Sequence, residues 1–219
     1  MNITRFDTNA PEMPAVLRRV IGAGGEAPVA LLGDSGILDG RLIGFFCSVR
    51  CPGDVILKTF DLARALRDAN ATVVCGFQSP MEREFLNLLI RGSVRVVVCP
   101  ARGLGRMRIL KVWNPPLDDC RLMFLSFFDD HVRRPTAATA AERNARVAAF
   151  SDTILIAHAE VGGKIEALCR KATGAGKTVF ALASDDNSHL FEIGARPVDV
   201  DDPEVLIQDW SESEAGEVG

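Results

Sequence analysis

A turn with the composition of a phosphate-binding loop lies at residues 47–54, which read Cys-Ser-Val-Arg-Cys-Pro-Gly-Asp. The turn follows an apolar run and leads into a predicted helix, whose first N–H groups and positive dipole end favour an anion. Arg50 would add a two-pronged clamp on a phosphate group. Neither a GxGxxG nor a Walker A pattern is present, so an ordinary strand-to-helix turn remains the alternative.

A second turn of this kind lies at residues 159–164, which read Ala-Glu-Val-Gly-Gly-Lys. Gly162 and Gly163 would let the backbone approach a ligand closely, because glycine has no Cβ. Lys164 adds a positive charge at the start of the predicted helix. We interpret this turn as the better of the two anion sites, with close packing of helix on strand as the alternative.

Arginines and aromatic residues are interleaved between residues 102 and 146, where nine basic groups face five acidic ones. The aromatic members are Trp113, Phe124, Phe127 and Phe128. Such a mixture would suit single-stranded nucleic acid, because basic groups neutralise the backbone and aromatic rings stack on bases. The alternative is a solvated basic loop beside phenylalanines of the core.

Metal binding and catalysis receive little support from the sequence. Four cysteines fall near the ends of predicted strands and could bind zinc or an iron–sulfur cluster: Cys47, Cys51, Cys75 and Cys99. Without a CxxC pair, small apolar side chains in tight turns are the favoured interpretation, and we predict free thiols and no metal. The three histidines are scattered, so we assign no catalytic residue and no cofactor, and favour a protein that is not an enzyme.

The elements that would position these residues alternate along the chain. Continuous apolar runs predict strands at 42–46, 72–75, 94–99, 121–128, 153–158 and 178–182. Helical spacing predicts helices at 14–21, 55–69, 81–91, 139–150 and 163–173. This alternation predicts an α/β single domain, with a mostly parallel sheet and helices on both faces. Ligands of such sheets bind at the carboxyl ends of the strands, where the turns described above begin.

Charge divides the chain into a basic body and an acidic tail. The net charge is -4, but eight acidic and no basic residues lie from Pro197 onward, which leaves 25 basic and 21 acidic groups before it. We expect a lead-in at 1–40 packed on a domain at 41–200, followed by an acidic tail at 201–219. No apolar run approaches about 18 residues, and no secretory signal is seen, so we expect a cytoplasmic protein without membrane contact.

Several segments resemble, in order and spacing, those of the DNA-processing protein A family (DprA, also called Smf). The matching segments stand where the family has its Tyr-x-x-Gly-Asp, Gly-Ser-Arg, Arg-Asn-Arg-Ile-Ile, Ser-Gly-Ser/Thr and Asn-x-Leu-Ile…Gly-Ala elements: residues 31–34, 47–50, 142–152, 162–164 and 187–195. The resemblance covers about residues 12–200. It implies a Rossmann-like domain that is dimeric, binds single-stranded DNA and helps to load a RecA-type recombinase.

One family motif is altered. The family's Ser-Gly-x-Ala-x-Gly-Ile-Asp segment reads Cys-Gly-Phe-Gln-Ser-Pro-Met-Glu at residues 75–82, which keeps Gly76 and has Glu82 in place of the Asp. The residues that we predict to bind phosphate, directly or through a close backbone approach, are Ser48, Arg50, Gly76, Arg143, Asn144, Arg146, Gly162, Gly163 and Lys164.

Two other functions remain open at this stage. The first is binding, or hydrolysis, of a nucleotide or another phosphorylated small molecule, as in related phosphoribohydrolases. Those enzymes carry Pro-Gly-Gly-x-Gly-Thr-x-x-Glu, of which only Gly162 and Gly163 are present, while Glu166 falls three residues too early. The second is a scaffold that binds only proteins.

Overall fold

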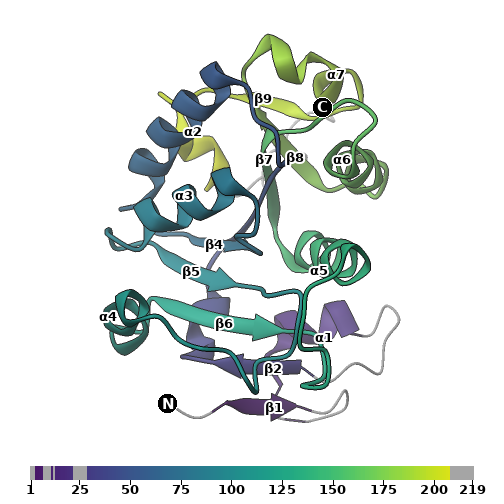
Figure 1. Cartoon of the computed structure of the whole chain (residues 1–219). Helices are drawn as coiled ribbons and strands as arrows, with labels where there is room; N and C mark the ends of the chain where they lie inside the picture. Colours follow the sequence, from purple (N-terminus) through teal and green to yellow (C-terminus); the bar gives the residue numbers. More distant parts are fainter. Residues whose placement is uncertain (1–2, 7–10, 12, 22–28, 208–219) are drawn as a thin grey trace, which may run out of the picture.

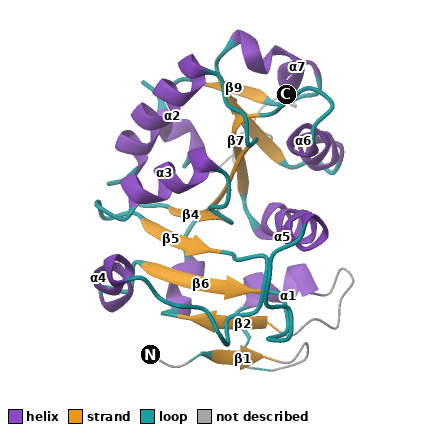
Figure 2. Cartoon of the chain, viewed as in Figure 1, coloured by secondary structure: helices purple, strands orange, loops and turns teal. Residues whose placement is uncertain are grey.

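The computed structural model describes residues 3–6, 11, 13–21 and 29–207. Within these residues, nine strands form one sheet in the order β1-β2-β6-β5-β4-β3-β7-β8-β9 (Figures 1 and 2). The strands are β1 (Thr4–Phe6), β2 (Val29–Leu32), β3 (Leu42–Cys47), β4 (Thr72–Cys75), β5 (Arg95–Val98), β6 (Leu122–Ser126), β7 (Thr153–His158), β8 (Thr178–Leu182) and β9 (Arg196–Val198). From β6 to β9 all neighbouring strands are parallel, whereas β2 runs antiparallel to β6 and to β1.

Helices cover both faces of the sheet, as predicted. They are α1 (Ala15–Ile21), α2 (Gly53–Leu66), α3 (Pro80–Leu89), α4 (Asn114–Asp118), α5 (Ala137–Phe150), α6 (Lys164–Gly174) and α7 (Ser188–Glu192). One apolar core joins the sheet to α1, α5 and α6, and the other joins it to α2, α3 and α4. Strand β3 feeds both cores, because alternate side chains such as Phe45 and Phe46 point to opposite faces.

Local signals fix where the helices begin. Ser79 caps α3 by accepting the N–H of Glu82, whose carboxylate in turn accepts the N–H of Ser79. Thr136 and Thr139 form the same reciprocal box at the start of α5. Both caps satisfy N–H groups that the first turn of a helix leaves without partners. They therefore set the positions at which these two helices leave the carboxyl edge of the sheet.

The predicted fold class is confirmed, and the differences lie at the ends of some elements and in short elements that were not predicted. The strands at 72–75, 153–158 and 178–182 match their predicted bounds. Strand β6 is shorter than the predicted 121–128, because the chain turns after Ser126 and buries Phe127 and Phe128 in a loop. The three-residue strands β1 and β9 were not predicted, since neither has a continuous apolar run.

The two ends of the chain are partly described. Strands β1 and β2 of the predicted lead-in extend the sheet on the side of β6. After β9, a single helical turn at Pro203–Leu206 packs on α2 with Leu206 fully buried. Most of the predicted acidic tail, residues 208–219, lies outside the described residues. No helix among the described residues is long and apolar enough to cross a membrane.

Candidate functional site

The strand order reverses between β3 and β7, and the loops after these two strands meet at the carboxyl edge. Such a reversal point is where open α/β sheets bind their ligands. Ser48 joins the two loops: its N–H donates to the carbonyl of His158 at 2.9 Å, and its hydroxyl accepts the N–H of Glu160 at 3.0 Å. Ser48 is buried, so in this structure it braces the crevice from within.

Arg50 projects from the same crevice into solvent. Its side chain is 89% exposed, and its Nη1 lies 4.0 Å from Oε1 of Glu160. An ion pair so long and so exposed contributes little to stability. The guanidinium of Arg50 is therefore available to a ligand at this edge.

The turn before α6 contains both predicted glycines. Gly162 has φ +70, a conformation that glycine adopts without strain, and a Cβ on Gly163 would lie 2.7 Å from the carbonyl oxygen of Glu160. The Gly162 N–H donates to the carboxylate of Glu166 at 2.6 Å, and this bond, with Arg170, lowers the pKa of Glu166. A carboxylate of the chain thus takes up one donor that a phosphate could use, while Lys164 remains exposed beside it.

Glu82 fills the turn after β4 in a similar way. It is buried at the start of α3, where its carboxylate accepts the N–H groups of Cys47 at 3.3 Å, Gln78 at 2.8 Å and Ser79 at 3.1 Å. These three donors lie at the end of β3 and on the loop after β4. The carboxylate of Glu82 therefore occupies the position at which these backbone N–H groups could otherwise bind an anionic ligand.

Arg143 is also internal. Its guanidinium is buried, and it donates from Nη1 to the carbonyl of Cys99 at 2.8 Å and from Nη2 to Oε1 of Gln78 at 3.0 Å. Its Nε is buried without a hydrogen-bond partner among the described residues. Arg143 thus ties α5 to the loops after β4 and β5.

Gly76 is the residue that makes room for this arginine. A Cβ at position 76 would lie 1.0 Å from Nη1 of Arg143 and 1.8 Å from its Cζ. The next residue, Phe77, has φ 49, a conformation that is uncommon for a residue with a side chain. Strain of this kind is kept only where the surroundings hold it, and here Arg143 and Glu82 hold both flanks of the turn.

The remaining predicted residues of α5 lie apart from the crevice. Arg146 pairs with Glu142 one turn earlier, at 3.0 Å, and lies 5.5 Å from the ring centre of Phe127. Asn144 lines a groove of about 510 Å³ between α5 and α6, whose walls are mostly alanine and whose rim includes Lys164. The structure thus brings Ser48, Arg50 and the 162–164 turn together at the crevice. Asn144 shares the α5–α6 groove with Lys164, and Arg143 and Arg146 lie elsewhere.

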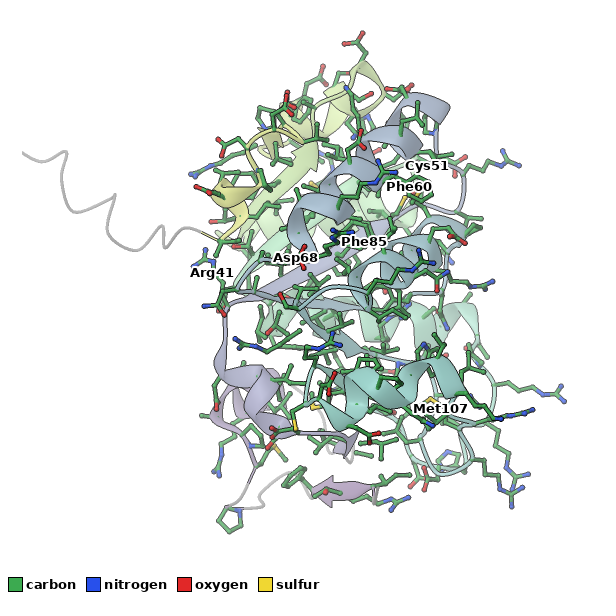
Figure 3. The ribbon with its side chains drawn as sticks, turned by 90° about the vertical axis from the view of Figure 1, so that its left-hand side faces the viewer. Arg41, Cys51, Phe60, Asp68, Phe85 and Met107 are labelled. Carbon is green, nitrogen blue, oxygen red and sulfur yellow. The ribbon has the colours of Figure 1, made fainter. Side chains whose placement is uncertain are left out.

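The arginine-rich stretch forms two loops that bond to each other. The Gly103 N–H donates to the carbonyl of Val132 at 3.0 Å, and the Gly105 N–H donates to the carboxylate of Asp130 at 2.7 Å. Four arginines of these loops are exposed: Arg106, Arg108, Arg133 and Arg134. Figure 3 places Met107 and Cys51 toward one edge of the molecule and Arg41, which precedes β3, at the opposite edge. The exposed arginines beside Met107 therefore belong to the carboxyl edge.

The aromatic residues of this stretch do not share that exposure. Phe124, Phe127 and Phe128 are buried, and Trp113 is half-buried against Phe124, with ring centres 5.2 Å apart. The phenylalanines therefore belong to the core, which was the alternative interpretation of the sequence. These three phenylalanines therefore offer no exposed ring to a base.

The cysteines at the edge are free thiols. A hydrogen bond from Cys47 to Cys51, together with burial, raises the pKa of Cys47, and the same bond lowers the pKa of Cys51. Burial raises the pKa of Cys75, and raises that of Cys99 to about 12. Within the described residues, no group of three or more His, Cys, Asp or Glu side chains is arranged to hold a metal ion.

Sequence reasoning missed the role of Asn187 as a brace. Asn187 is buried and donates from Nδ2 to the carbonyls of Ala157 and Leu182, both at 2.9 Å, while its Oδ1 lies 3.1 Å from Nδ1 of His158. It therefore holds the carboxyl ends of β7 and β8 together. The resemblance flagged the position, but only the structure shows that its amide bonds two strand ends.

Comparison with known proteins supports the fold and little more. No family model and no curated protein matches the sequence. Among solved structures, DprA from Streptococcus pneumoniae superposes with a TM-score of 0.75 at 16% identity, over 96% of this chain and 76% of that one. DprA from Helicobacter pylori, whose structure addresses its single-stranded DNA binding mode, gives 0.74 at 18% identity, over 94% of this chain and 96% of that one.

The fold is that of DNA-processing protein A. The resemblance inferred from the order of segments is confirmed at this level. A more distant similarity links the chain to a molybdenum cofactor binding protein from Rippkaea orientalis, with a TM-score of 0.55 at 10% identity, over 77% of this chain and 95% of that one. At such identities the similarities establish the architecture of the chain and leave its ligand to be argued from the site.

Proposed function

We propose that the chain is a DprA-like protein that binds single-stranded DNA along the carboxyl edge of its sheet. The observation that carries this proposal is the row of exposed arginines on the loops after β3, β5 and β6: Arg50, Arg106, Arg108, Arg133 and Arg134. Arginines spread over three loops can contact several successive phosphates, as a flexible polyanion requires. The DprA fold and the DNA-binding mode described for the Helicobacter pylori protein support the same ligand.

The sealed turns favour an extended strand over a single phosphate group. Glu82 takes three backbone donors near α3, and Glu166 takes one near α6. A phosphate at either position would meet a carboxylate at close range, which opposes binding. The charged groups that remain for a ligand are exposed side chains. Each contributes little binding free energy alone, so tight binding requires a ligand that contacts many of them at once.

Six of the nine predicted residues divide into two groups under this proposal. Arg50 and Lys164 contact phosphates directly through their side chains. Gly162 and Gly163 shape the turn that presents Lys164, since Glu166 takes the Gly162 N–H. Arg143 and Gly76 act indirectly, because they position the turn after β4. A homodimer, recombinase loading and a cytoplasmic location follow from the DprA-like function and share its status as proposals.

The test is a fluorescence-anisotropy titration of the chain with labelled oligo-dT at two salt concentrations, with a mononucleotide as competitor. We expect saturable binding that weakens steeply with salt, because each phosphate contact releases counterions. The mononucleotide should displace the strand only at a large excess. Binding that is insensitive to salt, or no binding at low salt, would contradict the proposal.

A small phosphorylated ligand is the second candidate. The structural similarity to a molybdenum cofactor binding protein and the glycine turn before α6 favour it. It predicts that a mononucleotide at millimolar concentration raises the melting temperature, since a ligand that binds only the folded state stabilises it. Thermal stabilisation together with full displacement of oligo-dT by an equimolar mononucleotide would favour this candidate over DNA.

A further inference from the structure

A hollow of about 580 Å³ lies between the first turns of α2 and α3, next to the crevice. Ile56, Phe60 and Met81 form an apolar part of its lining, and Arg50 and Arg83 contribute positive charge. Figure 3 shows Cys51 and Phe60 close together on the side of α2 that faces the carboxyl edge. This hollow is separate from the 162–164 turn and from the α5–α6 groove.

We propose that this hollow receives one base of the single-stranded DNA, with Phe60 as the stacking surface and Arg50 and Arg83 on the flanking phosphates. The inference rests on the proposed function and assigns the position at which a base of the strand binds by stacking, in addition to the charge contacts of its phosphates. Its volume lies within the range of pockets that hold small ligands. A planar, apolar group joined to an anion fits an apolar lining beside two cations.

The distribution of aromatic rings supports this position. The phenylalanines of the arginine-rich stretch are buried, so they offer no ring to a base. Phe60 is half-buried and lines the hollow, and it lies one helical turn beyond Ile56 on the same face of α2. A ring held on a helix is a firmer stacking surface than one on a loop.

The charges around the hollow match the proposed occupant. Arg50 is 89% exposed, and Arg83 is exposed on the first turn of α3. Glu84 also lines the hollow, and its carboxylate would repel a phosphate placed beside it. With two arginines and one glutamate, the lining of the hollow carries a net positive charge.

Cys51 provides a direct probe of occupancy, because it lines the hollow and is half-buried. The bond from Cys47 lowers its pKa, which favours the reactive thiolate. Cys120, an exposed thiol before β6 at the opposite edge, serves as the internal control. We expect saturating oligo-dT to slow alkylation of Cys51 by iodoacetamide at least fivefold, measured by mass spectrometry, and to leave Cys120 unchanged. A strand of equal length without bases should protect Cys51 much less.

Two variants with matched controls complete the test. Phe60→Leu keeps the apolar volume but removes the ring, and should weaken oligo-dT binding about tenfold with little change in melting temperature. Arg83→Ala should weaken binding, while Leu57→Ala on the exposed side of α2 and Arg91→Ala beyond the end of α3 should not. Normal DNA binding by Phe60→Leu, with Cys51 unprotected in the wild type, would overturn the inference and leave the proposed function standing. Absence of DNA binding by the wild-type chain would overturn both.

Discussion

The turn after β4 and the paired loops after β5 and β6 lie along the same edge of the sheet but use their charged residues in opposite ways. Around the turn, Arg143 of α5 and Glu82 of α3 are buried and bond to backbone and side-chain groups of the chain itself. In the loops, Arg106 and Arg133 face solvent. The turn after β4 therefore keeps its shape through internal bonds without a ligand. The arginines of the two loops are hydrated and can exchange that water for the phosphates of a ligand.

The largest effect is expected when the internal anion is removed. Glu82→Ala leaves the N–H groups of Cys47, Gln78 and Ser79 without their acceptor, and each buried donor without a partner costs about 1–3 kcal/mol. We expect a loss of about 4 kcal/mol in the free energy of unfolding, measured by urea denaturation. Glu84→Ala, an exposed neighbour on α3, is the control and should change it by less than about 0.5 kcal/mol. A similar loss in both variants would break the comparison.

The second largest loss of stability is expected when the buried guanidinium of Arg143 is removed. Arg143→Ala removes two hydrogen bonds and leaves a cavity beneath the turn, so we expect a loss of about 3 kcal/mol. Arg64→Ala, at an arginine of α2 that pairs with Asp61 at the surface, should cost less than about 0.5 kcal/mol. If Arg143→Ala were as stable as the wild type, Arg143 would have to lie in solvent, as the sequence-based prediction of a phosphate contact requires.

A substitution at Gly76 tests the same contact between Gly76 and Arg143. Gly76→Ala forces the guanidinium of Arg143 out of its place, and we expect a loss of about 2 kcal/mol. In the Arg143→Ala background the same change should cost little, because the clashing group is gone. Gly53→Ala is the matched control, since a Cβ there meets nothing within 4 Å. Fully additive losses in the double variant would show that the two residues act independently.

Ser48 should give the smallest loss of stability. Ser48→Ala removes the acceptor for the Glu160 N–H, and the expected cost is about 1 kcal/mol. Ser188→Ala, at an exposed position on α7, should be close to neutral. Hydrogen exchange of the Glu160 amide should rise in Ser48→Ala; an unchanged rate would mean that the loops after β3 and β7 are held by other contacts.

The sequence predicted the frame of the molecule better than its chemistry. The run Thr153–His158 is apolar throughout, and a strand buried on both faces needs little else to be recognised. Gly76 was predicted to let the backbone approach a phosphate closely, whereas in the structure the guanidinium of Arg143 fills the space beside it. No local pattern could reveal this, because the two residues are 67 positions apart and Arg143 lies on a helix in which half of the residues are alanine.

Burial also decided what composition could not. The guanidinium of Arg146 lies against the ring of Phe127. Such a pair could form part of a nucleic-acid binding surface, or the arginine could cover a phenylalanine of the core. Only the burial of Phe127 separates these possibilities. Phe60 and Arg83 gave no signal in the sequence, because each looks like an ordinary helical residue until α2 and α3 are placed side by side.

The central claim is that the open loops, and not the sealed turn, hold the DNA backbone. The most direct measurement is the salt dependence of oligo-dT affinity for the wild type and for a variant with alanine at positions 106, 108, 133 and 134. The slope of log K against log salt is negative, and each lost phosphate contact reduces its magnitude by about 0.7 for single strands. We therefore expect the slope of the variant to be less negative by about 2.8, with the melting temperature unchanged. An unchanged slope would contradict the account.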